Sequence, residues 1–451
     1  AAARAAPCDI LGAASPPTPC VAAHSTTRAL FSSYAGPLYQ VRRASDGRDL
    51  DIHPGAPGGF ADSAAADKFC AGAACHIWLI YDQSPRHNHL HIAPPGGNHE
   101  KADAPVNATR QSLLVGGHKV YAAVFEGGMG YRRDNTSGIA TGDAAQTIYM
   151  VASGTHYNSE CCFDYGNAEV NNDDDGRGTM EAVSLSTHND RGSGVGEGPW
   201  ILADLEDGMY AASRQPGSAK SIRHEYVTAM LKGDSASAGH PDGHFATKGG
   251  DAQAGELTVY YDGARPKGYS PMKKQGALIL GIGGDNSDRG VGTFYEGVVA
   301  RGFTSDATDA AIQRDIVAAR YGTRPSTPTP APPNPACNAA GCSVKWSWDA
   351  AGGGTCKLQR GNAMIPYSNS SGRGTQLASC TYSAPAPSGT VTVHQQLYCH
   401  VLAGGTPTVQ AHTSWQNSNN DGDDDKGHIV AKGCSDSDPK YSGEGQCCFA
   451  T

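Results

Sequence analysis

The chain has 451 residues, enough for two domains, and it combines 58 glycines with only 18% charged residues, which is typical of a turn-rich, all-β protein. Its net charge of −9 and the lack of a basic cluster exclude nucleic acids and anionic membrane surfaces as expected partners. No run of 18 apolar residues occurs, so no transmembrane helix is predicted.

The cysteines and glycosylation motifs indicate the secretory route. The chain has 14 cysteines, an even number, and N-glycosylation sequons at Asn107, Asn135 and Asn369. It begins at Ala1 without a methionine or an apolar leader, as a mature chain does after removal of a signal peptide. We therefore expect a secreted protein that works outside the cell or in the cell wall.

The first 150 residues predict short strands joined by Gly-rich turns. Examples are His76–Tyr81, Leu113–Val115 and Val120–Phe125, a pattern typical of a β-sandwich. The histidine-rich turn His87–His91 lacks cysteines or carboxylates at a recognisable ligand spacing, so we interpret it as a loop and expect no metal site. No cofactor is expected.

Six cysteines in the first 162 residues are closely spaced in pairs. Adjacent cysteines usually bond to two different partners, so the residues alone favour separate partners for Cys161 and Cys162. The spacing of the other four fits two small closed loops, Cys8 with Cys20 and Cys70 with Cys75.

The stretch Gly198–Tyr210 has the alternation of a strand but carries acids where a buried strand carries apolar side chains. Alternation puts Asp204 and Glu206 on one face with Trp200 and Leu202. At a strand spacing of roughly 7 Å the two carboxylates repel each other and lose hydration, which raises at least one pKa. Such a pair suits acid–base or nucleophilic chemistry on a sugar, whereas a solvated outer strand face is the alternative.

Two later segments complete the predicted domain. The apolar strand 276–282 ends in Gly283, Gly284 and Asp285, where a ligand could approach the backbone closely, although a turn that simply ends the strand is the alternative. From Ser305 to Tyr321 the apolar period becomes helical, and Gly322 provides a stop.

Residues 7 to about 322 resemble the catalytic domain of family 54 glycoside hydrolases, the fungal α-L-arabinofuranosidase B type. The matching motifs follow the family order and include Cys20–Leu30, Cys161–Glu169, the stretch 198–210 and Gly281–Asn286. The resemblance implies a concanavalin/laminin-G-like β-sandwich. It also implies a retaining exo-α-L-arabinofuranosidase whose partner is an arabinofuranose-containing polysaccharide or glycoprotein.

The resemblance also implies roles for individual residues. Glu206 matches the nucleophile and Asp285 the general acid/base, which in a retaining enzyme lie roughly 5 to 5.5 Å apart. The pairing it implies for the cysteines includes a vicinal disulfide, which reverses the expectation from the residues alone. The residues expected to hold the sugar are Asp204, Asp207, Gly284, Trp200, Cys161 and Cys162, and the expected disulfides are Cys8–Cys20, Cys70–Cys75 and Cys161–Cys162.

Two residues depart from the family pattern. Asp207 stands where the family has Asn, and Arg191 stands where it has a pocket Trp. A carboxylate beside Glu206 disfavours ionisation nearby, and Arg191 would offset that if it turned inward, so a changed substrate or pH optimum is expected. The alternative function is a catalytically weak carbohydrate-binding protein or a structural extracellular protein of a matrix or fibre that reuses the hydrolase fold.

A Pro/Thr-rich linker at 324–336 separates the domain 1–323 from a tail at 337–451. The tail carries eight cysteines and predicts a small, disulfide-rich β module that we do not assign to a family. For its aromatic residues we expect core packing rather than sugar stacking. Nothing in the sequence indicates self-assembly.

Overall fold

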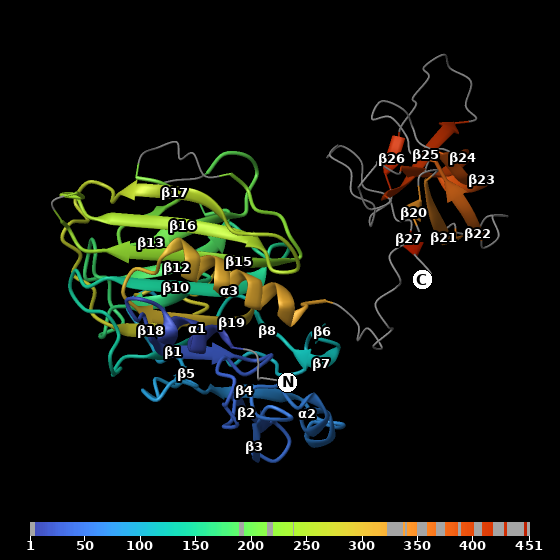
Figure 1. Ribbon diagram of the computed structural model, residues 1–451. Coiled ribbons are helices and arrows are strands. Elements are labelled where there is room, and N and C mark those ends of the chain that lie inside the picture. The colour runs from blue at the N-terminus through green and yellow to red at the C-terminus, as the bar shows by residue number, and fades with distance from the viewer. Residues whose placement is uncertain are drawn as a thin grey trace. The chain divides into compact units, whose positions relative to one another are not determined.

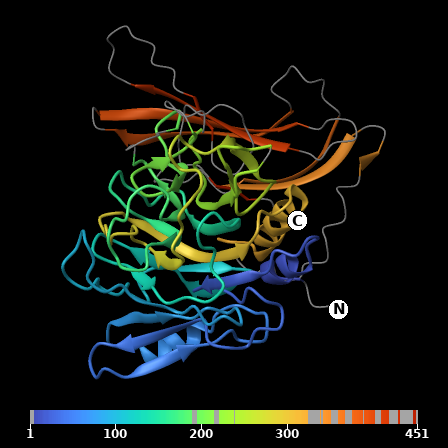
Figure 2. The same ribbon diagram turned by 90° about the vertical axis from the view of Figure 1, so that its left-hand side faces the viewer.

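The computed structural model describes residues 5–188, 194–213, 220–237 and 239–322, together with strand segments between 337 and 448. The chain divides into two compact units, Ala1–Pro325 and Ser326–Thr451, so the division falls within the predicted linker (Figures 1 and 2). None of the described helices has the length and apolar character needed to cross a membrane.

The first unit is a sandwich of two antiparallel sheets, which confirms the predicted fold class. One sheet has the strand order β1 (Cys20–Ser25), β19 (Gly292–Arg301), β10 (Gln146–Ser153), β15 (Tyr226–Asp234), β16 (His244–Asp251) and β17 (Thr258–Ala264), with β8 (Ala123–Phe125) also paired to β19. The other sheet has the order β14 (Met209–Tyr210), β13 (Trp200–Asp204), β12 (Glu181–Ser186), β11 (Asp164–Ala168), β18 (Ala277–Leu280), β9 (Tyr131–Arg133), β5 (Leu90–Ile92), β4 (Cys75–Ile80), β2 (Tyr39–Arg43) and β3 (Asp49–Ile52). A separate hairpin joins β6 (Ser112–Val115) to β7 (His118–Tyr121).

The hydrophobic core lies between the two sheets. Ile201 and Ala203 of β13 face inward, and the Ile201 side chain packs so closely on Gly249 of β16 that a Cβ there would clash with it. Because strand side chains alternate, Leu202 and Asp204 face the other way. This parity places Asp204, the acidic residue of β13, on the outer face of the sheet that contains β13.

Helix α3 (Asp306–Ala319) covers the outer face of the other sheet, as Figure 1 shows. Ser305 caps it by accepting a hydrogen bond from the Thr308 N–H at 3.2 Å, and Asp309 accepts bonds from Lys232 and Lys248 at 2.7 Å each. The predicted helix is confirmed. It ends at Ala319 and is capped by Arg320, whose φ is 58°, rather than stopped by Gly322 as predicted.

Two short helices were not predicted. Helices α1 (Pro7–Ala13) and α2 (Ser63–Phe69) have seven residues each, too few to show a clear helical period. Each carries or adjoins a disulfide, Cys8–Cys20 or Cys70–Cys75, so tertiary bonds hold both helices in place. These two pairs are those that the family resemblance implies.

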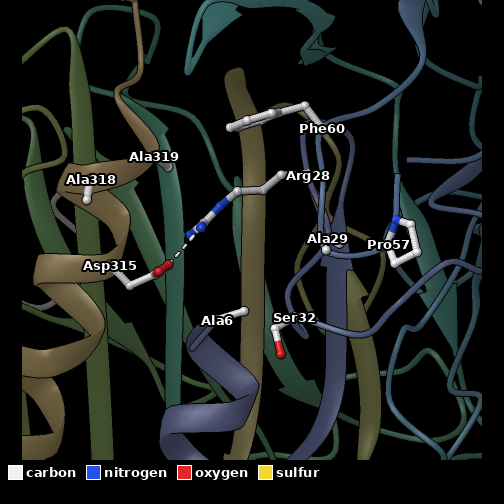
Figure 3. A pocket seen from close by; sticks show the side chains of 10 residues that line it. Ala6, Arg28, Ala29, Ser32, Pro57, Phe60, Asp315, Ala318 and Ala319 are labelled. Carbon is white, nitrogen blue, oxygen red and sulfur yellow. Dashed lines mark hydrogen bonds and ion pairs between the residues drawn. The ribbon is translucent and has the colours of Figure 1, made fainter. Parts of the chain in front are cut away.

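A buried ion-pair network ties the segment after β1 to β19 and α3. The Arg28 guanidinium reaches Glu296 at 2.5 Å and Asp315 at 2.7 Å, and Tyr321 donates to Glu296 at 2.6 Å. Figure 3 shows Arg28 pointing toward Asp315 in a small pocket beside Phe60. None of the residues that line this pocket is a predicted site residue, so we interpret the network as structural.

We expect Arg28→Met to lower the free energy of unfolding by about 3–5 kcal/mol, because it removes a buried cation that pairs with both Glu296 and Asp315. Chemical denaturation measures the change. The matched control is Arg110→Met, which removes an exposed ion pair with Glu126 and should cost less than about 1 kcal/mol. Equal losses in the two variants would contradict the structural role of the network.

The second unit is described as strands only. One sheet contains β20 (Cys337–Asn338), β21 (Gly341–Asp349), β22 (Gln359–Ile365) and β27 (Gln446–Cys448), and the other contains β23 (Thr375–Ala386), β24 (Gly389–His400), β25 (Thr408–Asn417) and β26 (His428–Val430). Cys399 is buried and is not in a disulfide. The sequon Asn369 and the side chains of the other tail cysteines lie outside the described residues.

Candidate active site

Glu206 lies in a tight turn and not on a strand face, so the predicted strand position was wrong. Strand β13 ends at Asp204, and the Leu205 N–H donates to the Gly208 carbonyl oxygen at 3.1 Å. Glu206 and Asp207 are the two central residues of this turn, with φ values of 64° and 55°. Positive φ at both positions matches a type I′ hairpin turn. The turn therefore carries Glu206 back over the end of its own strand.

Four buried acids gather around this turn. Asp164 and Glu169 are fully buried, and Asp204 and Glu206 are at most 9% exposed. The Glu206 backbone N–H donates to Asp204 Oδ1 at 3.3 Å, which holds the Asp204 carboxyl against the turn that carries Glu206.

The acids share one electrostatic environment. Burial, followed by the charges of Asp204 and Glu169, raises the pKa of Glu206 far above its ordinary value. Burial also raises the pKa of Asp204, and burial with the Asp204 charge raises that of Asp164. The cluster therefore cannot hold four negative charges and keeps protons into the neutral range.

Asp285 comes to the same place on the loop after β18. Its Oδ1 accepts a hydrogen bond from the Ser287 N–H at 2.9 Å, and its Oδ2 accepts from the Asn98 side chain at 3.2 Å. Asp285 is half-buried, so water can reach it. A Cβ on Gly283 would lie 3.5 Å from Asp285 Oδ1, and one on Gly284 would lie 3.1 Å from Glu206 Oε2. Consecutive glycines thus lie beneath the two carboxyls.

A second loop holds the Asp285 loop in position. His99 contacts Asp288 at 2.7 Å, and the Asn286 side chain donates to Asp103 at 3.2 Å. The ligand atoms of His99, Asp103 and Asp288 lie within 4.8 Å of one another and could hold an ion. Their direct hydrogen bonds already account for this spacing, so we interpret them as a support for the loop.

One wall of the site is the disulfide between Cys161 and Cys162. Cys162 is buried against Trp200, Leu202 and Met209 on the outer face of the sheet, whereas Cys161 is partly exposed. The Cys162 Sγ lies 3.7 Å from Asp204 Oδ2. The disulfide therefore presents a small apolar surface directly beside the carboxyls.

Of the two residues that depart from the family pattern, the structure describes Asp207 but not Arg191. Asp207 is about half exposed and lies 3.7 Å from the Arg177 guanidinium, so its charge meets a counter-ion outside the carboxyl cluster. The Glu206 carbonyl oxygen accepts a bond from the Tyr269 hydroxyl at 2.8 Å, which holds the turn from the other side. Arg191 lies outside the described residues.

Sequence reasoning missed Asp164 and Glu169. Both belong to the stretch Cys161–Glu169, where acids flank an otherwise buried strand, as they do in the stretch 198–210. That shared feature is the signal that could have found them.

The two described sequons differ in exposure. Asn135 is exposed, and Asn107 is half-buried with its Oδ1 accepting the Thr109 N–H at 2.9 Å. N-glycosylation at both remains a prediction.

We expect Gly284→Ala to lower kcat/KM by roughly a hundredfold, the effect of a displacement near 1 Å at a reacting group. The added methyl would clash with Glu169 and press on Glu206. A matched control is Gly239→Ala, where a Cβ meets no atom within 4 Å. Steady-state kinetics decides the outcome, and an active Gly284→Ala enzyme would show that the glycine is not required.

Comparisons with known proteins agree with this arrangement. The family model described as "Alpha-L-arabinofuranosidase B, catalytic" matches residues 7–322. The chain is 50% identical over 335 residues to a probable alpha-L-arabinofuranosidase B from Aspergillus flavus, covering 72% of this chain and 64% of that protein. It is also 50% identical over 335 residues to an arabinofuranosidase/B-xylosidase from Trichoderma koningii, covering 72% of this chain and 65% of that protein. The chain thus spans slightly less than two thirds of these relatives.

A solved arabinofuranosidase structure is also similar. The enzyme complexed with arabinofuranosyl-alpha-1,2-xylobiose superposes with a TM-score of 0.67 at 36% identity, covering 92% of this chain and 83% of that one.

Proposed function

The chain belongs to glycoside hydrolase family 54, the α-L-arabinofuranosidase B family, and we propose that it is a retaining exo-α-L-arabinofuranosidase with Glu206 as nucleophile and Asp285 as general acid/base. The observation that carries the proposal is the meeting of the β13–β14 turn, the loop after β18 and the Cys161–Cys162 disulfide at one point of the sheet face. Each comes from a different part of the sequence.

In the first step, a Glu206 carboxylate oxygen attacks the anomeric carbon of a terminal α-L-arabinofuranosyl group. Asp285 donates its proton to the glycosidic oxygen, so the aglycone leaves as an alcohol and an arabinofuranosyl ester forms on Glu206. In the second step, Asp285 takes a proton from water, and the water oxygen attacks the same carbon and frees Glu206. Two inversions give net retention.

The surrounding residues fit this chemistry. Asp204 can accept hydrogen bonds from sugar hydroxyls, and the disulfide offers an apolar surface to one face of the furanose ring. Because Gly283 and Gly284 have no side chains, the sugar can approach the backbone between the two carboxyls. Trp200 is buried against Cys162, so its contribution to sugar binding is to support the disulfide from below.

The expected partner is an arabinofuranose-containing polysaccharide or glycoprotein. The complex of the similar enzyme with arabinofuranosyl-alpha-1,2-xylobiose supports a xylan side chain as one such substrate. The disulfides Cys8–Cys20 and Cys70–Cys75 and the exposed sequon Asn135 support a secreted, extracellular location.

The test is hydrolysis of an aryl α-L-arabinofuranoside by the purified full-length chain. We expect turnover with release of arabinose whose first-formed anomer retains the substrate configuration, which NMR observes directly. Binding of arabinofuranosides without turnover at any pH from about 3 to 8, a range that brackets carboxyl titration, would favour the alternative of a binding or structural protein.

A further inference from the structure

Glu169 follows strand β11 and is fully buried beside the candidate nucleophile. Its Oε1 accepts a hydrogen bond from the Thr179 hydroxyl at 2.5 Å, and its Oε2 has no hydrogen-bond donor in the described part of the chain. The nearby Arg132 guanidinium donates to the backbone carbonyls of Glu169 and Gly284 and not to this carboxyl. The free oxygen is therefore buried without a counter-ion.

The unpartnered oxygen points toward Glu206. A Cβ on Gly284 would clash with Glu169 Oε2 and lie 3.1 Å from Glu206 Oε2, so both carboxyl oxygens converge on the same glycine. Two buried carboxylates this close cannot both be ionised, because each disfavours the charge of the other. Burial raises the pKa of Glu169 to about 7 and that of Glu206 to about 11, so the two acids compete for one proton, and attack by Glu206 requires that proton to lie on Glu169. The pair therefore shares a proton at acidic pH.

The position of that proton decides whether Glu206 can attack. We propose that Glu169 is a positioning residue that keeps the proton and donates it as a hydrogen bond to Glu206, which leaves the nucleophile ionised. The inference deepens the proposed function and rests on it. No proton moves between Glu169 and Glu206 during the reaction, because the same Glu169 O–H then donates to the carbonyl oxygen of the arabinofuranosyl ester.

Two substitutions separate this role from that of a charged Glu169 and from a purely structural role. Glu169→Gln keeps a donor of the same size but cannot ionise, and Glu169→Met keeps the length and removes the donor. The Thr179 hydroxyl oxygen also lies 2.5 Å from the Gly176 carbonyl oxygen, to which its one proton can donate instead, so it retains a partner in both variants. Thermal melts check that each variant is folded.

The acidic limb of the kcat/KM profile reports protonation of the nucleophile. We expect Glu169→Gln to leave this limb unchanged and Glu169→Met to raise it by roughly one to two pH units, since a lost hydrogen bond to a charged group destabilises the ionised form. The control is Asp174→Asn, which removes an exposed charge that acts on Glu206 without contact and should shift the acidic limb slightly downward.

A downward shift of the acidic limb in both Glu169 variants would mean that Glu169 is itself charged. A fall in activity without any shift would mean a structural role only. Either result overturns the proposal.

A second measurement does not depend on activity. The infrared difference spectrum between the wild type and Glu169→Gln at acidic pH should contain the C=O stretch of a protonated carboxyl, lost in the variant. If this C=O stretch is absent, Glu169 does not hold the proton, and the inference is overturned even if the enzyme is active. Its presence in a protein that hydrolyses no arabinofuranoside would instead reject the proposed function alone.

Discussion

Glu206→Gln is expected to lower kcat by roughly four orders of magnitude or more, the scale on which covalent enzymes lose activity with their nucleophile. The amide keeps the size of the carboxyl and the turn geometry, but its oxygen is too weak a nucleophile to attack the anomeric carbon. Single-turnover kinetics with an aryl arabinofuranoside measures the loss.

The same variant should remain folded. Since the folded-state pKa of Glu206 is raised, the wild type gains stability from this group below its ordinary pKa of about 4.3 and loses it as the pH rises through the folded value. Gln cannot ionise, so the melting temperature of the variant should fall less between acidic and neutral pH. A lower melting temperature at neutral pH would mean that the lost activity reflects unfolding.

Labelling identifies the nucleophile independently. A mechanism-based arabinofuranosyl reagent should attach to Glu206 alone, and peptide mapping locates it. The matched control is Asp207→Asn, which restores the family residue in the same turn and should still be labelled at Glu206. Label on Asp204 or Asp207 would contradict the assignment.

The β-sandwich and the outward-facing position of Asp204 could be predicted from the sequence, because both depend on local patterns. Alternation along the stretch 198–210 correctly put Asp204 on the face opposite Ile201 and Ala203. It misplaced Glu206, because the strand ends two residues earlier and the chain turns with positive φ at two non-glycine residues. The pairing of Ala203 with Tyr210 and of Asp204 with Met209 and the Leu205–Gly208 hydrogen bond place the turn there. Asp207-Gly208 is a hairpin signal, but it suggests a turn one residue later than the observed one.

The partners of Glu206 could not be predicted from spacing. Glu169 and Gly284 are far from it in sequence, and they meet because β11 pairs with β12 on one side and with β18 on the other. Family resemblance named Gly284, whereas the one local signal for Glu169 is that it borders an otherwise buried strand. The order of strands in the sheet therefore determines which carboxyls lie close enough to share protons.

Asp285→Asn is expected to affect substrates according to their leaving groups. A general acid contributes about 10²–10⁴-fold where the leaving oxygen needs a proton, so kcat/KM for an arabinoxylan oligosaccharide should fall by roughly that factor. An activated aryl arabinofuranoside needs little protonic help, so its kcat/KM should fall far less. Its kcat should still drop, because Asp285 is also the base that activates water in the second step.

The control lies three residues further along the same loop. Asp288→Asn removes a contact to His99 at 2.7 Å and leaves Asp285 and its bond from the Ser287 N–H in place. If the loop acts only as a support, Asp288→Asn should lower kcat/KM for both substrates by the same factor. Azide, a nucleophile that needs no base, should restore kcat of Asp285→Asn with the aryl substrate and form an arabinofuranosyl azide of retained configuration. A leaving-group-independent loss without azide rescue would assign Asp285 to sugar binding, and the acid/base would then have to be another carboxyl of the cluster.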